Sequence, residues 1–216
     1  KYTEETVLWI NQHTPKLMTF AITRPDSYRF AAGQFSRLGF HEGEGFIWRA
    51  YSVVSAEYAE TLEYFAVLIE DGPMSNKLAT MQTGDKVLLD KTATGFLLPE
   101  RFPDGKDLIM LCTGSGIAPF LSVLQQPEIW QRFERLVLVH SVSYANELIF
   151  NQQIADLKEH PLIEEYVDKL TFIPVTTREQ TAGALNKRLP ELLSSGELSA
   201  VLDLPFTAAN SRFMIC

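Results

Sequence analysis

The first half of the chain carries short, mostly apolar runs at close spacing, the pattern of a series of short β-strands. Aromatic and β-branched residues are frequent in these runs, and turn residues such as Thr14-Pro15 and Asp71-Gly72-Pro73 separate them. The expected strands span 7–10, 17–22, 35–40, 46–54, 62–69 and 86–90. Six strands at this close spacing predict an antiparallel β-barrel or sandwich. One helix is expected within it over 75–81, with Ser75 as its N-cap.

Beyond residue 106 the pattern changes to buried strands that alternate with helices. Continuous apolar runs predict strands at 107–112, 136–140, 170–175 and 213–216. Helices are expected after the turn at 113–116, over 145–158 and over 185–193. This alternation indicates a parallel sheet of the α/β class. The sequence therefore predicts a β-barrel domain over 1–98, a linker over 99–106 and an α/β domain over 107–216.

Composition places the chain among ordinary globular proteins. Of its 216 residues 46% are hydrophobic and 21% are charged, and the formal net charge is −8. The acidic balance argues against nucleic acid as a partner, and no apolar run is long enough to span a bilayer. Two cysteines, Cys112 and Cys216, cannot form a disulfide framework or a metal site, which favours a reducing cytoplasm. The chain stops within an apolar strand, so we expect a truncated C-terminus.

The stretch Arg49-Ala50-Tyr51-Ser52 places polar chemistry inside the apolar run 46–54. Strand alternation puts Arg49 and Tyr51 on one face and Ala50 and Ser52 on the other. An Arg in such a run needs an anionic partner, because buried charges are paired. A fixed cation, a stacking ring and a short hydroxyl are what a flavin with a pyrophosphate tail requires. The alternative is an Arg paired with a Glu at the rim of a barrel.

Two glycine turns that precede predicted helices are candidate anion sites. Gly72-Pro73-Met74-Ser75 opens the helix of the first half, where free backbone N–H groups and the helix dipole favour an anion. A plain helix cap would explain the same residues. Thr113-Gly114-Ser115-Gly116 joins a strand to a helix in the second half, where open parallel sheets bind nucleotides. A simple tight turn is the alternative, because the third Gly of the dinucleotide fingerprint is missing.

Taken together and in this order, Arg-x-Tyr-Ser, Gly-x-x-Ser and Thr-Gly-x-Gly-x-x-Pro resemble the ferredoxin–NADP⁺ reductase family, in its bacterial branch that serves ferredoxin or flavodoxin. The resemblance covers 6–216. It implies that the barrel domain holds FAD, that the α/β domain holds NADP(H), and that the enzyme passes electrons between NADPH and ferredoxin or flavodoxin. We expect a cytoplasmic monomer.

The resemblance also implies roles for single residues. Arg49 would bind the FAD pyrophosphate, Tyr51 would stack on the isoalloxazine, and Ser52 would donate near flavin N5. Further flavin contacts are implied for Ala50, Phe65, Ala66, Val67, Leu68, Pro73, Met74, Ser75 and Thr113. The catalytic residues would be Tyr51, Ser52 and Cys216, which matches a family cysteine near the nicotinamide.

For NADP(H), the resemblance implies a nucleotide turn at Gly114 and Gly116 and a 2′-phosphate clamp made by Arg178 and Arg188. Arg suits this role because its guanidinium fork donates two hydrogen bonds at once. The family usually carries another Arg where this chain has Ser143. We therefore expect weaker discrimination of NADPH from NADH.

Two other functions fit the same residues. One is a reductase component that serves an oxygenase or another redox partner, and the other is a nucleotide-binding regulatory protein that binds no flavin. The expected carriers are acidic, as is this chain, so docking would require a local basic patch. The candidate cations near the barrel strands are Arg24, Arg29, Arg37 and Lys77.

Overall fold

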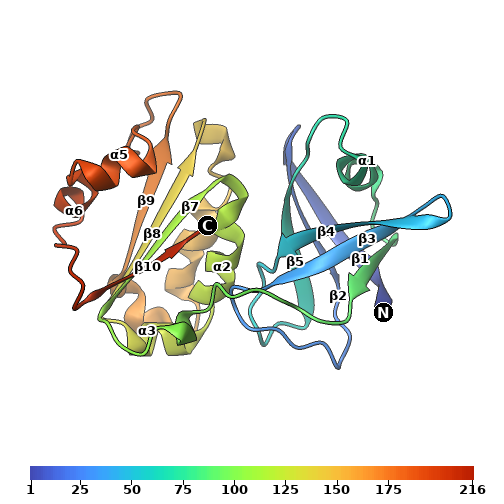
Figure 1. Ribbon diagram of the computed structural model, residues 1–216, viewed down its shortest axis with the longest axis horizontal. Coiled ribbons are helices and arrows are strands. Elements are labelled where there is room, and N and C mark those ends of the chain that lie inside the picture. Colours follow the sequence, from blue (N-terminus) through green and yellow to red (C-terminus); the bar gives the residue numbers. More distant parts are fainter. The chain divides into compact units, whose positions relative to one another are not determined.

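The computed structural model describes residues 1–216, apart from the side chain of Lys158, as two compact units (Figure 1). Unit 1 comprises Lys1–Leu98 and Ala118–Val123, and unit 2 comprises Pro99–Ile117 and Leu124–Cys216. In unit 1 the Ser122 hydroxyl donates to the Ser55 carbonyl at 2.8 Å, which ties the short second segment to the first. The domain bounds expected from the sequence stay a prediction.

Unit 1 is built on a six-stranded antiparallel sheet in the order β4-β3-β6-β1-β2-β5. Its strands are β1 Tyr2–Thr14, β2 Leu17–Thr23, β3 Phe35–Glu42, β4 Gly45–Ser52, β5 Thr61–Val67 and β6 Lys86–Asp90. Strand β1 is longer than expected because its first residues pair with β6 and its later ones with β2. The edge strands β4 and β5 meet at an isolated bridge between Val53 and Tyr64. The sheet is therefore barrel-like without a closing ladder.

Helix α1 (Pro73–Thr80) covers the core of unit 1 with Met74 and Leu78, which are both buried. The expectation that Ser75 caps this helix is wrong. Gly72 is the N-cap and Pro73 the first helical residue, since the fixed φ of proline suits that position. Ser75 lies one turn further on, and its hydroxyl accepts the Ile69 N–H at 2.8 Å.

Unit 2 contains a four-stranded parallel sheet in the order β10-β7-β8-β9, which confirms the predicted α/β class. Its strands are β7 Asp107–Thr113, β8 Arg135–Val142, β9 Leu170–Thr176 and β10 Ser211–Ile215. The α-helices of the second half of the chain are α2 Ala118–Leu124, α3 Pro127–Arg132, α4 Asn151–Asp156, α5 Leu189–Ser194 and α6 Glu197–Val201. Short 3₁₀ turns are η1 Pro99–Arg101, η2 Gly114–Ile117, η3 Ala145–Glu147, η4 Leu157–Glu159 and η5 Glu164–Lys169.

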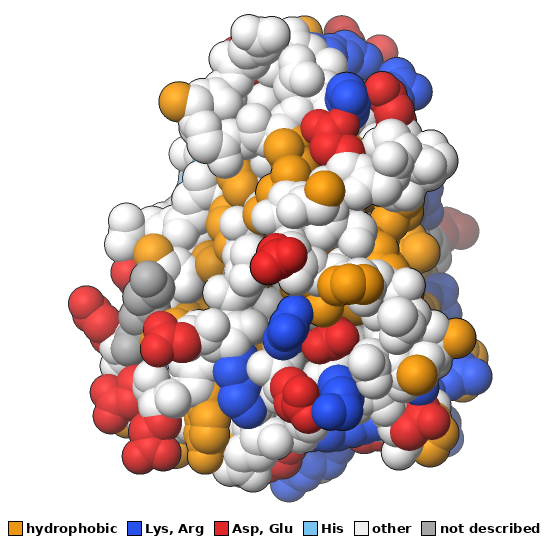
Figure 2. Space-filling model, turned by 90° about the vertical axis from the view of Figure 1, so that its left-hand side faces the viewer, with side chains coloured by type: hydrophobic (Ala, Val, Ile, Leu, Met, Phe, Trp, Pro, Cys, Tyr) orange, Lys and Arg blue, Asp and Glu red, His pale blue; other side chains and the backbone are white. Residues whose placement is uncertain are grey.

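One face of this sheet is covered by α5 and α6 (Figure 1). Ile109 and Val137 from the strands pack there against Leu192 and Leu198 from the helices, in one buried cluster. Figure 2 looks onto this side of unit 2, where acidic and basic side chains are interspersed and hydrophobic side chains are exposed between them.

Two predicted helices of unit 2 differ from the structure. The helix expected over 145–158 is broken into η3, α4 and η4, because the apolar run 148–150 interrupts the helical spacing and buries Phe150. The helix expected over 185–193 begins only at Leu189, because Leu185 exchanges backbone hydrogen bonds with Pro174 and Thr176. Helices α3 and α6 were not predicted. No helix in the described part of the chain combines the length and the apolar character needed to cross a membrane.

Candidate functional site

The strand order of unit 2 reverses direction at β7, since β8 and β9 lie on one side of it and β10 on the other. Such a switch point at the carboxyl ends of parallel strands is where open α/β sheets bind nucleotides. Thr113 ends β7 at this edge, and Cys216 follows the end of β10 beside it. The Gly-rich turn η2 begins directly after Thr113. The structure thus brings Thr113, Gly114, Gly116 and Cys216 together.

Backbone contacts hold β10 tightly against this turn. The Thr113 N–H donates to the Cys216 carbonyl at 3.1 Å, and the Cys216 N–H donates to the Leu111 carbonyl at 2.9 Å. A Cβ built at Gly116 would lie 2.6 Å from the Cys216 oxygen, so only glycine fits there. Gly114 has φ +50, a conformation that favours glycine, with open space around its Cα. The two glycines therefore serve different needs, close packing at Gly116 and backbone shape at Gly114.

The thiols at this edge are not poised as nucleophiles. Cys112 is fully buried in β7, and burial raises the pKa of its thiol well above the ordinary value, with a further rise from nearby Cys216. Burial also raises the pKa of Cys216, whose residue is still exposed to solvent. Because the reactive form of cysteine is the thiolate, these raised pKa values favour the protonated, less nucleophilic form of both thiols at neutral pH.

One histidine reaches this turn from β8. His140 is 1% exposed, and its Nε2 lies 2.9 Å from the Gly114 carbonyl oxygen. Burial lowers the pKa of His140, while the bond to Gly114 and the charge of Glu147 oppose the shift. The residue-by-residue prediction missed this contact because His140 and Gly114 are far apart in the sequence.

The loops after β8 and β9 form the next part of the edge. The Arg178 N–H donates to the Ser143 carbonyl at 3.0 Å, and the Thr177 N–H donates to the Val142 carbonyl at 2.9 Å. The Glu179 carboxylate accepts the Ala145 N–H, a contact that the sequence did not reveal. Ser143 and Arg178 are therefore side by side, and the backbone of Arg178 is fixed by its neighbour loop.

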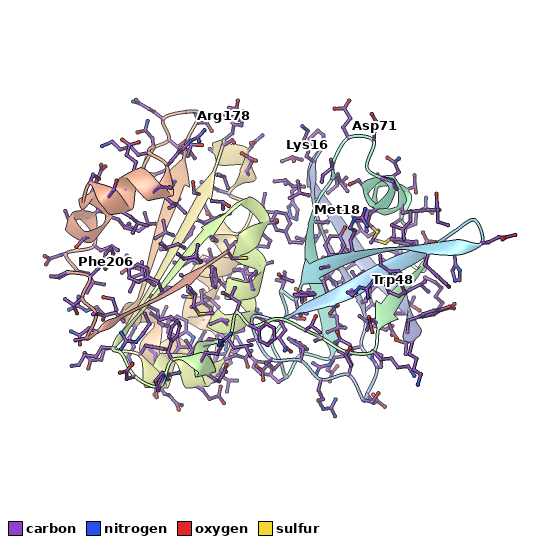
Figure 3. All side chains as sticks on the ribbon, viewed as in Figure 1. Lys16, Met18, Trp48, Asp71, Arg178 and Phe206 are labelled. Carbon is purple, nitrogen blue, oxygen red and sulfur yellow. The ribbon has the colours of Figure 1, made fainter. Side chains whose placement is uncertain are left out.

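The side chains of the two predicted clamp arginines are exposed. Arg178 extends from the loop after β9 (Figure 3), and Arg188 is the N-cap residue of α5. In the described part of the chain neither guanidinium pairs with a carboxylate. Their neighbour Lys187 does pair, with Glu197 at 2.6 Å. Two unpaired guanidinium groups in this part of unit 2 are suited to a phosphate.

In unit 1 the predicted flavin strand is β4, at the edge of the sheet. Arg49 is exposed there, and its guanidinium donates to the carbonyl of the preceding Trp48 at 2.8 Å. The premise that Arg49 is buried is wrong, because β4 lies at the edge of the sheet and the side chain reaches water. The alternative of an Arg paired with a Glu at the rim is wrong too, since among the described residues no carboxylate pairs with Arg49.

Tyr51 and Ser52 follow Arg49 on β4 and are half-buried, while Ala50 is exposed. Tyr51 packs against the core of unit 1, and burial raises the pKa of Tyr51 to about 12 while the Arg49 guanidinium opposes the rise. The phenol is thus neutral at physiological pH and rigid enough to support a flat ligand. Ser52 pairs with Phe35 across the sheet.

The remaining predicted flavin contacts lie on β5 and α1. Phe65 and Ala66 are buried, Val67 is exposed where β5 ends, and Leu68 is half-buried against the core of unit 1. At the start of α1 the first N–H that bonds within the turn is that of Asn76, to the Gly72 carbonyl at 2.9 Å. The N–H groups of Met74 and Ser75 find no acceptor in the described part of the chain. Pro73 is exposed beside them. These free donors, together with the positive end of the helix dipole, are suited to an anion.

The chemistry of these residues is that of cofactor binding. The described residues contain no cluster of His, Cys, Asp or Glu suited to a metal ion. Unit 1 offers an exposed cation, a supported phenol ring and a helix start. Unit 2 offers a switch point with a Gly-rich turn and two exposed cations.

Comparison with known proteins identifies relatives over the whole chain. A family profile described as "Oxidoreductase NAD-binding domain" matches residues 110–216. Ferredoxin–NADP reductase A of Sorangium cellulosum is 40% identical over 218 aligned residues, which cover 100% of this chain and 78% of the relative. Ferredoxin–NADP reductase of Azotobacter vinelandii is 37% identical, covering 98% of this chain and 83% of the relative.

Among solved structures, a ferredoxin NADP⁺ reductase from Neisseria gonorrhoeae with bound FAD and NADP superimposes with a TM-score of 0.93. It is 65% identical, and the match covers 100% of this chain and 85% of that one. The order of the barrel-like sheet and the parallel sheet is the same order that the sequence resemblance implied. On this evidence the chain belongs to the ferredoxin–NADP reductase family.

Proposed function

We propose that this chain is an FAD-dependent oxidoreductase that passes electrons between NADPH and ferredoxin or flavodoxin in the cytoplasm. The observation that carries the proposal is the 65% identical structure with FAD and NADP bound, which matches this chain over its full length. FAD, when bound, accepts a hydride from NADPH at N5 and releases the electrons one at a time. The protein supplies the binding, orientation and shielding that make this exchange specific.

The residues of unit 1 fit FAD. Arg49 is a cation without a carboxylate partner in the described part of the chain, so it is available for a pyrophosphate. The free N–H groups of Met74 and Ser75 offer a second contact for an anion. Tyr51 supplies a neutral ring held against the core, and Ser52 supplies a hydroxyl close in sequence to it. We assign Arg49 to the pyrophosphate, Tyr51 to stacking on the isoalloxazine and Ser52 to the neighbourhood of N5.

The residues of unit 2 fit NADP(H). Arg178 and Arg188 are exposed guanidinium groups without carboxylate partners among the described residues, and we assign them to the 2′-phosphate. Gly114 and Gly116 shape the turn that the dinucleotide approaches at the switch point. Cys216 contributes a neutral thiol beside this turn, which suits contact with the nicotinamide ring better than proton transfer. Ser143 gives no charge to the phosphate, so discrimination against NADH rests on two arginines.

Of the four cations expected from the sequence to dock an acidic carrier, two donate to backbone carbonyls of unit 1 and two form surface ion pairs. Arg24 donates to the backbone carbonyls of Tyr28, Glu57 and Ala59. Arg29 donates to the Asp26 carbonyl at 2.6 Å. The other two cations form surface ion pairs, Arg37 with Asp90 at 3.7 Å and Lys77 with Glu42 at 2.8 Å. Exposed pairs are weak, so Arg37 and Lys77 remain able to exchange their partners for a carrier carboxylate.

The proposal is tested with purified protein supplemented with FAD. The expected result is a yellow protein whose flavin absorbance bleaches when NADPH is added without oxygen and returns when oxidised ferredoxin or flavodoxin is added. The non-flavin alternative predicts a colourless protein that binds nucleotide alone. Protein that takes up no FAD would refute the proposal. Bleaching without reoxidation by either carrier, but with reoxidation by an oxygenase partner, would favour the oxygenase-reductase alternative.

A further inference from the structure

His140 is a buried polar side chain to which the cofactor assignments give no role. It lies in β8, is 1% exposed, and reaches the Gly-rich turn with its Nε2 at 2.9 Å from the Gly114 carbonyl oxygen. Its other ring nitrogen, Nδ1, is buried without a hydrogen-bond partner in the described part of the chain. Burying an unpaired nitrogen lowers the stability of the fold. The one hydrogen bond that the ring does make therefore matters for its placement.

The hydrogen-bond partners fix the protonation of this ring. A carbonyl oxygen only accepts hydrogen bonds, so Nε2 carries the proton and donates it to Gly114. The lone pair of the neutral ring is then on Nδ1. A second proton on Nδ1 would bury a charge and a donor that has no acceptor, which agrees with the lowered pKa of His140. Glu147 is the acidic group whose charge opposes this shift. The ring is therefore a neutral donor of fixed tautomer at physiological pH.

The hydrogen bond orients a whole peptide group. The Gly114 carbonyl and the Ser115 N–H belong to one planar trans peptide and point in opposite directions. Because His140 holds the carbonyl toward β8, the Ser115 N–H points away from it. That N–H starts the turn η2 and has no acceptor in the described part of the chain, as is usual for the first donors of a helical turn. Gly114 makes this orientation accessible with φ +50.

We propose that His140 is a positioning residue for NADP(H): it locks the Gly114–Ser115 peptide so that the Ser115 N–H donates to a pyrophosphate oxygen of the dinucleotide. The inference rests on the proposed function, since it names how one turn of that site is held. His140 itself touches no cofactor. Its contribution is pre-organisation, because a turn that must reorient on binding loses affinity by the cost of that ordering.

Two amides of different length test the geometry. In His140→Gln the side-chain nitrogen occupies the place of Nε2, so the donor to Gly114 is kept. In His140→Asn the nitrogen stops near the place of Nδ1 and cannot reach the carbonyl. We expect the Asn variant to raise both the Kd for NADP⁺ and the KM for NADPH about tenfold, the effect of losing one buried hydrogen bond and its alignment. The Gln variant should stay within about threefold of wild type, and kcat should change less than KM in both.

The matched control is Val137→Ala, also in β8 but facing the α5 and α6 side of the sheet. It should lower the melting temperature without changing the Kd for NADP⁺. Nitrogen NMR of the histidine rings supplies a second readout, in which His140 should show the Nε2-protonated tautomer at neutral pH. Equal Kd values for Asn and wild type, a Gln variant as weak as Asn, or a proton on Nδ1 would each overturn the proposal. If wild-type protein binds no NADP⁺, the proposed function fails instead, and the tautomer measurement still decides whether His140 holds the turn.

Discussion

Replacing Gly116 by alanine tests whether β10 and the Gly-rich turn are packed as closely as the structure shows. The new Cβ would lie 2.6 Å from the Cys216 oxygen and 2.7 Å from its carbonyl carbon. Comfortable carbon contacts are about 3.5–4.0 Å, so the two backbones would have to separate by roughly 1 Å. Both neighbours are backbone atoms, and the Cys216 peptide is tied to Thr113 and Leu111 by hydrogen bonds. The clash therefore cannot be relieved by rotating a side chain.

The expected cost follows from these contacts. Overpacking a well-filled site costs about 1–3 kcal/mol, and weakening one of the two strand hydrogen bonds adds about 1 kcal/mol. We expect Gly116→Ala to lower the free energy of unfolding by about 2–4 kcal/mol. For a chain of this size that corresponds to a drop in Tm of about 4–16 °C. The displaced turn should also bind NADP⁺ more weakly.

The assay is thermal unfolding, together with titration of NADP⁺ followed by the flavin spectrum. The matched control is Gly196→Ala in the same unit, where φ is +75 but nothing lies within 4 Å of the added Cβ. That variant bears only backbone strain of about 1–2 kcal/mol and should bind NADP⁺ normally. If Gly116→Ala melts no lower than Gly196→Ala and keeps wild-type affinity for NADP⁺, close packing is not the reason for glycine at this position.

Three further predictions concern charge. Arg49→Ala should weaken FAD binding about tenfold or more, as expected for a charge-assisted hydrogen bond, while the Tm of the apoprotein is unchanged; undiminished FAD affinity in a fluorescence titration would contradict the pyrophosphate role. Arg178→Ala should raise the KM for NADPH about tenfold more than that for NADH, and an equal rise for both would exclude a role at the 2′-phosphate. Burial lowers the pKa of His140, so the unfolded state takes up the proton at a higher pH than the folded state does. The free energy of unfolding should therefore fall as the pH drops below the ordinary value of 6.5, by at most about 1.4 kcal/mol per pH unit. Unfolding experiments on His140→Gln should lack this pH-dependent loss of stability.

Local patterns were enough to predict the strands and the fold class. The apolar runs of β2, β7 and β8 belong to strands that are buried over most of their length, and that information is contained in a few neighbouring residues. Helix boundaries were predicted less well from the sequence. The helix expected over 145–158 broke, and the helix expected from Leu185 began at Leu189, because partners elsewhere in unit 2 took up the backbone groups. Tertiary contacts decided these boundaries, and the sequence pattern could not reveal them.

In the predicted site, too, the surroundings of each residue depend on tertiary contacts that local sequence does not reveal. Arg49 was expected to be buried, and this was wrong, because the position of β4 at the edge of the sheet depends on strand order and not on the residues nearby. Strand order likewise makes Ser143 and Arg178 neighbours. The contact of Glu179 with the loop after β8 could not be foreseen from spacing, because it joins two loops that only the parallel pairing of β8 and β9 brings together.

The two glycines of the Gly-rich turn are constrained by different strands. In the sequence Gly114 and Gly116 are two equivalent small residues that let a phosphate approach. In the fold each is constrained from a different direction, Gly114 by the ring of His140 on β8 and Gly116 by the backbone of Cys216 after β10. The turn is therefore held from both neighbouring strands of β7, which are the two strands that define the switch point. A turn fixed on both sides presents its free donor in one orientation before any ligand arrives, so its contribution to affinity depends on residues that never touch the ligand.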